Sequence, residues 1–254
     1  MQKYKRELSL GFFTRSSFND FETVDLVMNL WHEHFKETFP DRWGPLRANR
    51  KFSIEYLEDL RSDWQFMAFF ARRKGHSHEF TIFIADPIEI SGRYAVFMGN
   101  PYYTEGMEQS ADAFISAVCS NLTIALGYLH LTNETDWTKE INSDHRHLTK
   151  QGVCGKYLYE RASKYSSISY FFPKFELGVP NLYWKTYLGR ECIDILGEDQ
   201  ISSCPAYKVE WLNREHAAIQ LTDSICDSFL NEDSFENTRL MAKKHFGIEK
   251  FQVE

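Results

Sequence analysis

Apolar residues recur every three to four positions in three segments of the chain, and this period predicts amphipathic helices. The clearest segment covers residues 20–37, where Asn19 or Asp20 can cap the helix N-terminus. A second helix is expected to open at Ser53, and a third near Met107. Each helix would bury its apolar face against the rest of the protein.

A fourth helix is predicted from its end signals, which are the clearest in the chain. Asn231 is a suitable N-cap residue, and Gly247 stands just past the other end. The charges suit the helix dipole, with acidic residues in the first turns and basic residues in the last. These residues are Glu232, Asp233, Glu236, Lys243, Lys244 and His245.

Short runs rich in aromatic and β-branched residues predict strands between the helices. Residues 5–13 give the first strand, and residues 123–131 give another. Three runs separated by turn-length breaks predict an antiparallel meander: 66–72, 79–86 and 93–99. Residues 207–212 and 217–222 predict a hairpin near the end of the chain.

The order of these elements indicates the class of fold. Strands and helices are interspersed without regular βαβ alternation, so we expect an α+β fold, with a mixed, largely antiparallel sheet and helices packed on it. The chain has no internal repeat and no linker rich in Gly, Ser or Pro. Residues 1–254 are therefore expected to form a single domain.

Charge narrows the choice of partner. The net charge is −7, whereas nucleic-acid binders are usually basic, so direct nucleic-acid binding is not expected. Residues 190–254 hold 13 acidic and 7 basic residues, and residues 1–189 hold 23 and 22. The acidic excess thus lies almost wholly in the last quarter of the chain, where it suits a basic partner.

The cysteines and the apolar runs predict a cytoplasmic protein with no membrane contact. The five cysteines are odd in number and none is spaced as Cys-x-x-Cys, which favours free thiols in a reducing compartment. The N-terminus does not read as a signal peptide. The longest apolar run, residues 66–71, is far shorter than the roughly 20 residues of a membrane span. No cofactor is expected, and folding should need neither metal nor disulfides.

Motifs of the common enzymes are absent from the sequence: there is no phosphate loop, no GxGxxG and no GxSxG. The best candidate for chemistry is Asp144, His145 and His147, a carboxylate and two imidazoles in a polar stretch. They would make the chain a metal-dependent hydrolase. The alternative interpretation, a solvated polar loop, is favoured, so the chain is expected not to be an enzyme.

The most distinctive stretch covers residues 178–197 and contains Asn-Leu-Tyr-Trp-Lys-Thr-Tyr-Leu-Gly. It resembles the Asn-Leu-x-Trp-x-Thr-Tyr-Leu-Gly region of bacterial immunity protein family 52, which belongs to polymorphic-toxin and type VI secretion systems. A second group of type VI immunity proteins has a similar Trp-x-Thr-x-Leu-Gly stretch. The residue types suggest structural roles: Trp184 suits a core, and the glycines suit turns.

The resemblance implies a non-enzymatic inhibitor that binds a cognate toxin and protects the producing cell. The family resembles partners of toxins that have a restriction-endonuclease-like domain. A nuclease attracts phosphate, so its active face tends to be basic. An acidic inhibitor can occupy that face and associate rapidly through electrostatic steering.

Within the acidic quarter, residues 214–236 are the predicted partner-binding segment. This segment contains six carboxylates and only one arginine, and its two phenylalanines could supply an apolar anchor. The alternative is that the carboxylates serve only the helix N-terminus and solubility. The predicted contact residues are Asp223, Asp227, Phe229, Glu232, Asp233, Phe235 and Glu236.

Overall fold

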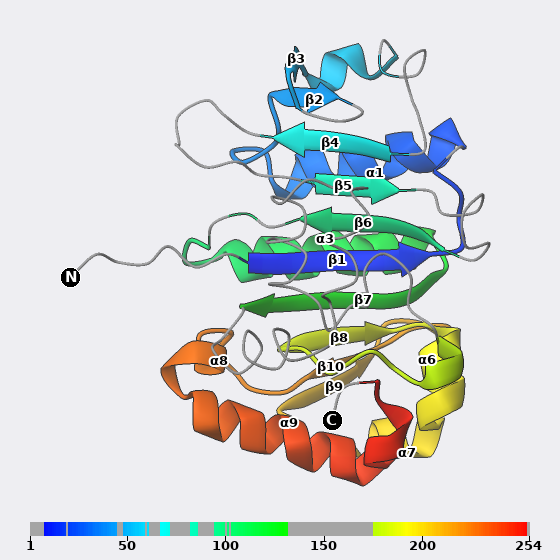
Figure 1. The fold of residues 1–254 in the computed structure, drawn as a ribbon, viewed down its shortest axis with the longest axis vertical. Helices are drawn as coiled ribbons and strands as arrows, with labels where there is room; N and C mark the ends of the chain where they lie inside the picture. The colour runs from blue at the N-terminus through cyan, green and yellow to red at the C-terminus, as the bar shows by residue number, and fades with distance from the viewer. Residues whose placement is uncertain are drawn as a thin grey trace, which may run out of the picture.

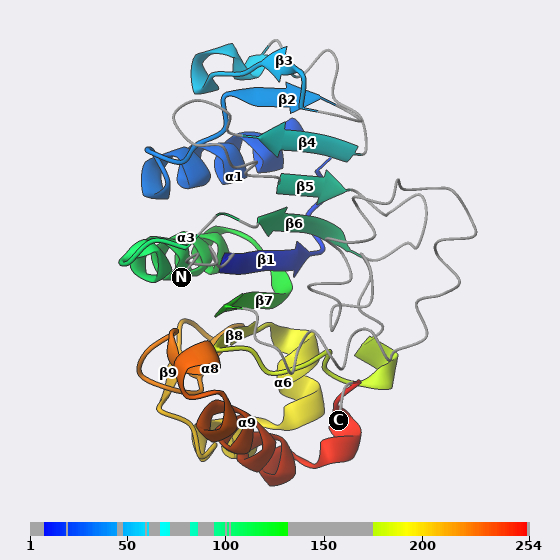
Figure 2. The ribbon, with the colours of Figure 1, turned by 60° about the vertical axis from the view of Figure 1, so that its left-hand side comes forward.

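The computed structural model of the chain describes residues 8–18, 20–44, 48–58, 60, 67–71, 82–85, 94–99, 101, 103–131 and 175–252. Within them, one antiparallel sheet of ten strands runs in the order β3-β2-β4-β5-β6-β1-β7-β8-β10-β9 (Figure 1). Helices α1 and α3 lie on one face of its first half (Figure 2). The α+β prediction, with helices on a largely antiparallel sheet, is confirmed.

The strands are β1 (Leu8–Thr14), β2 (Arg42–Gly44), β3 (Arg50–Lys51), β4 (Met67–Ala71), β5 (Ile82–Ala85), β6 (Ala95–Gly99), β7 (Ile124–Leu131), β8 (Lys185–Leu188), β9 (Lys208–Trp211) and β10 (Ala217–Gln220). The α-helices are α1 (Phe21–His34), α3 (Met107–Asn121), α6 (Arg190–Leu196), α7 (Glu198–Ser202), α8 (Asp227–Leu230) and α9 (Glu232–Phe246). Short 3₁₀ turns are η1 (Ile54–Tyr56), η4 (Phe175–Leu177) and η5 (Ile248–Lys250).

Aromatic rings build the core between the sheet and helices α1 and α3. Phe12 of β1 stacks on Phe97 of β6, with centroids 5.2 Å apart. Trp31 of α1 meets Phe97 edge-on at 5.5 Å, and Phe114 of α3 lies 5.3 Å from the same ring. These rings are all buried, so the high aromatic content of the chain serves largely to fill this layer.

Most predicted elements are present. Asp20 caps α1, because its side chain accepts a hydrogen bond from the Glu22 backbone N–H. Strands β4, β5 and β6 form the predicted meander, and β9 and β10 form the predicted hairpin. Gly247 ends α9 with a φ of 101°, a backbone conformation that favours glycine.

The structure differs from the local predictions in some details. The helix expected to open at Ser53 begins as the 3₁₀ turn η1 and continues as α-helix at residues 57, 58 and 60, and Ser53 does not cap it through its side chain. Asn231 does occupy the N-cap position of α9, but its amide donates to Asp227 Oδ1 instead of capping the helix. Several short elements were not predicted, because they give little periodic signal: strands β2, β3 and β8 and helices α6, α7 and α8.

Other predictions lie outside the described residues. These are the candidate metal site of Asp144, His145 and His147 and the polar loop that contains it. The single-domain organisation of residues 1–254 also stays a prediction.

Candidate functional site

The distinctive stretch of the sequence places β8 inside the sheet, between β7 and β10. Trp184, Thr186 and Leu188 share one face, and Lys185 and Tyr187 share the other, because side chains alternate along a strand. All five are buried. The Trp184 indole donates from Nε1 to the Thr222 carbonyl oxygen at 3.0 Å. The stretch is therefore structural, and the expectation of a core role for Trp184 is confirmed.

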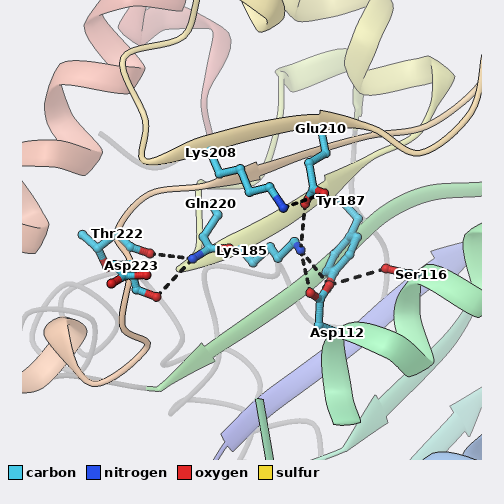
Figure 3. A network of polar contacts seen from close by, with 9 residues as sticks. All are labelled: Asp112, Ser116, Lys185, Tyr187, Lys208, Glu210, Gln220, Thr222 and Asp223. Atoms are coloured by element: carbon cyan, nitrogen blue, oxygen red, sulfur yellow. Dashed lines mark hydrogen bonds and ion pairs between the residues drawn. The ribbon is translucent and has the colours of Figure 1, made fainter. Parts of the chain in front are cut away.

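Figure 3 shows a polar network on the Lys185 face of β8. The buried Lys185 ammonium lies 2.7 Å from Asp112 of α3 and 3.4 Å from Glu210 of β9. The Tyr187 hydroxyl donates to Asp112 Oδ1 at 2.5 Å. Lys208 forms a 2.7 Å ion pair with Glu210. Two cations thus balance two carboxylates, which satisfies the charge of the buried lysine.

The electrostatics of this network favour a structural role over a catalytic one. Burial, and then the Asp112 carboxylate, raise the pKa of Tyr187 well above its usual value, so its hydroxyl stays a proton donor. The hydrogen bond from Lys208 lowers the pKa of Glu210, so this carboxylate stays ionised. Lys185 is enclosed and already paired. The network therefore holds α3 against β8 and β9.

Metal chemistry finds no support among the described residues. No group of three or more His, Cys, Asp or Glu side chains is arranged there to hold an ion. The described cysteines are free thiols: Cys119, Cys192, Cys204 and Cys226. Burial raises the pKa of Cys119 to about 12 and that of Cys204 to about 12, so neither is a ready nucleophile.

The predicted partner-binding residues follow one another along the loop after β10, α8 and the start of α9, at the lower left of Figure 1. Asp223 and Asp233 are exposed, and Asp227 and Glu232 are half-buried. Asp227 Oδ1 accepts a hydrogen bond from the Asn231 amide at 2.8 Å. Solvent reaches all four of these carboxylates, and we call them the acidic surface.

Two residues of the prediction have other roles. Phe235 is 0% exposed and stacks on His130 of β7, with ring centroids 5.5 Å apart. Its ring is a core ring and is not available as a surface anchor. Glu236 forms an ion pair with the buried Arg239, whose guanidinium also donates to the Leu182 carbonyl oxygen. Glu236 therefore neutralises an internal charge.

The exposed apolar side chain in this region is one that the sequence analysis missed. Leu230, the last residue of α8, is 69% exposed, whereas Phe229 beside it is half-buried and packs on the core. The spacing of Phe235, Ala242 and Phe246 could have shown that Phe235 is buried. Positions seven and eleven residues apart share a helix face, and these three residues are apolar. That face is the buried one, which leaves Leu230 as the apolar group beside the acidic surface.

His216 is a buried histidine whose hydrogen bonds require the neutral form. Its Nε2 accepts from the Ile124 backbone N–H at 3.2 Å, and its Nδ1 lies 3.1 Å from Asn213 Oδ1. The Asn213 amide donates to the Cys119 carbonyl oxygen, which fixes its oxygen towards His216. Burial lowers the pKa of His216 below its usual value of 6.5.

The protein is therefore expected to lose stability as the pH falls below about 6.5, the pKa of an unfolded histidine. As the pH falls, the unfolded chain binds a proton at His216 before the folded chain does. The contribution of His216 to the free energy of unfolding is therefore complete above about pH 6.5 and is lost as the pH falls towards the lower pKa of the folded state. Urea unfolding from about pH 7.5 to about pH 5 measures how steeply the free energy of unfolding changes with pH. His216→Gln should flatten it, and an unchanged slope would contradict this role.

No helix among the described residues is both long and apolar enough to cross a bilayer.

Comparison with solved structures finds a similar fold in the Pseudomonas aeruginosa T6SS protein PA0821. The match has a TM-score of 0.58 and covers 95% of this chain and 72% of that chain, at 11% sequence identity. At this identity the likeness shows a shared fold. No protein-family model matches the chain, and a search of curated proteins finds no match.

Proposed function

We propose that this chain is a cytoplasmic immunity protein that binds and neutralises a cognate toxin of a type VI secretion system. The observation that carries the proposal is the fold match to a T6SS protein over 95% of the chain. The family 52-like stretch points in the same direction from the sequence. Its residues build the core around β8, so the stretch would be retained for the fold and not for a reaction.

The contacts of the described residues support a binding role. The buried Lys185 and Arg239 are neutralised by carboxylates within the chain, so their charges are used to hold elements together. The acidic surface, by contrast, has carboxylates at the solvent boundary and an exposed leucine beside them. Interfaces commonly combine an apolar contact with a polar rim, so this arrangement suits a protein partner.

The proposed toxin is a nuclease of the restriction-endonuclease-like type, as the resemblance implies. Such an enzyme presents cationic groups to the DNA phosphates. The carboxylates of the acidic surface would take the place of those phosphates. Attraction between the two surfaces would mainly accelerate association, and salt would screen it.

Reversing Asp223, Asp227 and Asp233 to lysine together is expected to slow toxin association by about tenfold or more at low salt, because steering is lost. The slope of the association rate against salt should also become flatter. Binding kinetics with the cognate toxin measure both quantities. Thermal unfolding of the variant checks the fold, since Asp227 also bonds to Asn231.

The matched control reverses Glu33, Glu37 and Glu105, which are all exposed and lie outside the predicted segment. It makes the same change in net charge and should alter association much less. If the two triple variants behave alike, net charge and not this surface governs association. An unchanged rate and salt slope in the first variant would remove the acidic surface from the interface.

The alternative, a metal-dependent hydrolase that uses Asp144, His145 and His147, predicts a different property of the purified protein. A hydrolase of that kind would carry about one metal ion per chain. The proposed inhibitor would neutralise its toxin equally well before and after chelation.

A further inference from the structure

Strand β9 is the last strand of the sheet, beyond β10 (Figure 1). All four of its residues are at least partly exposed, whereas three of the four in β10 are buried. Within the described residues, no further strand continues the sheet past β9. Such an edge presents backbone N–H and C=O groups that another strand can pair with.

The side chains of this edge have an unusual pattern. Tyr207, just before β9, and Trp211 are 57% and 40% exposed, and with Val209 they lie on one face. Lys208 and Glu210 lie on the other face and form an ion pair. The pattern is symmetric about Val209: an aromatic residue stands two positions away on each side, and a long charged residue stands one position away on each side. The two charged residues have opposite signs.

This pattern suits antiparallel pairing with the same strand of a second copy. With Val209 on the two-fold axis, Lys208 lies opposite Glu210 of the second copy. In the same register, Tyr207 lies opposite Trp211 of the second copy. Opposite charges and aromatic pairs directly across two antiparallel strands are both stabilising. The symmetry repeats each pair, as a two-fold interface requires.

Neighbouring registers lack this complementarity. Moving the axis to Lys208 places the two lysines opposite each other, and moving it to Glu210 does the same for the two glutamates. Like charges directly opposite are destabilising. A lysine on an edge strand normally discourages pairing with another strand. Here the register centred on Val209 places a carboxylate, Glu210 of the second copy, opposite Lys208.

We infer that two copies of this chain associate through β9 in the register centred on Val209, which joins their sheets into one. The inference does not depend on the proposed toxin. The edge adjoins the acidic surface, because the side chains of Tyr207 and Asp223 interact. Because the paired strands are short, the interface is small and the dimer is a weak one.

Sedimentation velocity of the full chain, from about 1 µM to about 1 mM, covers the affinities expected of such an interface. The wild type should shift from monomer to dimer within that range. Lys208→Glu places two glutamates opposite two others and should weaken dimerisation by about tenfold or more. Arg214→Glu, the same charge change in the exposed turn after β9, should leave the dimer intact. Thermal unfolding checks that both variants are folded.

Oxidative cross-linking tests the register. Val209→Cys should form a disulfide-linked dimer, since the two residues face each other across the axis. Lys208→Cys alone should cross-link far less, but a mixture of Lys208→Cys and Glu210→Cys should form the mixed dimer. The wild type under the same oxidant controls for the partly exposed Cys226.

Three results would overturn the inference. One is a wild-type chain that stays monomeric up to about 1 mM. Another is a dimer that Lys208→Glu leaves unchanged, because the interface would then lie elsewhere. The third is a monomer whose Lys208→Glu variant loses toxin binding, which would assign the edge to a strand of the toxin.

Discussion

Replacing Gly189 by alanine is expected to destroy the native packing of β8 against β7. A Cβ atom on Gly189 would lie 1.7 Å from the Ile124 backbone oxygen, far inside van der Waals contact. Backbone, not a flexible side chain, is in the way, so the two strands would have to separate. The Gly189 N–H also donates to the Ala125 carbonyl oxygen at 3.0 Å. We expect a loss of about 4–5 kcal/mol or more, which is exceptional for one methyl group.

Gly127→Ala is the matched comparison for this prediction. The three atoms nearest to a Cβ there are side-chain atoms of Ile115, Tyr187 and Ile124, at 3.2–3.3 Å. These can shift by a few tenths of an ångström, so the cost should be clearly smaller. Urea unfolding of both variants, or their soluble yield where the first does not fold, measures the difference. Equal stability of the two would show that β7 and β8 can move apart freely.

Trp184→Ala is expected to destabilise the protein by roughly 3–5 kcal/mol, the usual cost of truncating a large buried side chain. The residue is 5% exposed, so its ring contributes to the core and not to a surface. Denaturant unfolding measures the free energy directly. A variant with normal stability but lost partner binding would show that Trp184 is a contact residue instead.

The control for Trp184 is Trp184→Phe, which keeps most of the buried ring and removes the indole donor. It should cost about 1–2 kcal/mol, because one hydrogen bond and part of the packing are lost. The Thr222 carbonyl keeps a partner, since the Gln220 amide also donates to it at 2.8 Å. A phenylalanine variant as unstable as the alanine variant would mean that the hydrogen bond, and not the ring, dominates.

Local signals made several elements predictable. Asp20 begins α1 and Gly247 ends α9, because capping depends on residues adjacent in sequence. The meander and the β9–β10 hairpin were predictable for a similar reason, since the strands that pair follow one another along the chain. Asn231 shows the limit of such signals. It occupies the predicted N-cap position, but its side-chain amide donates to Asp227 instead of capping the helix.

The partner-binding segment stays a prediction, and the structure shows only where its residues lie. Its composition identified an acidic stretch, and Asp223 and Asp233 are indeed exposed. Composition does not distinguish a carboxylate in solvent from one that pairs with an internal arginine, as Glu236 does with Arg239. Nor does it separate a core phenylalanine from an exposed one. Phe235 is buried because α9 lies against His130 of β7, about a hundred residues earlier in the chain.

By itself, the sequence determined the elements with strong local patterns, the α+β class and the uneven distribution of charge. The tertiary structure alone decided the strand order, in which β1 enters between β6 and β7 and β10 between β8 and β9. It also decided that Lys185 is an internal cation, because its partners Asp112 and Glu210 stand 73 and 25 positions away. Local patterns follow from the geometry of neighbouring residues, whereas these contacts exist only once distant segments have packed together.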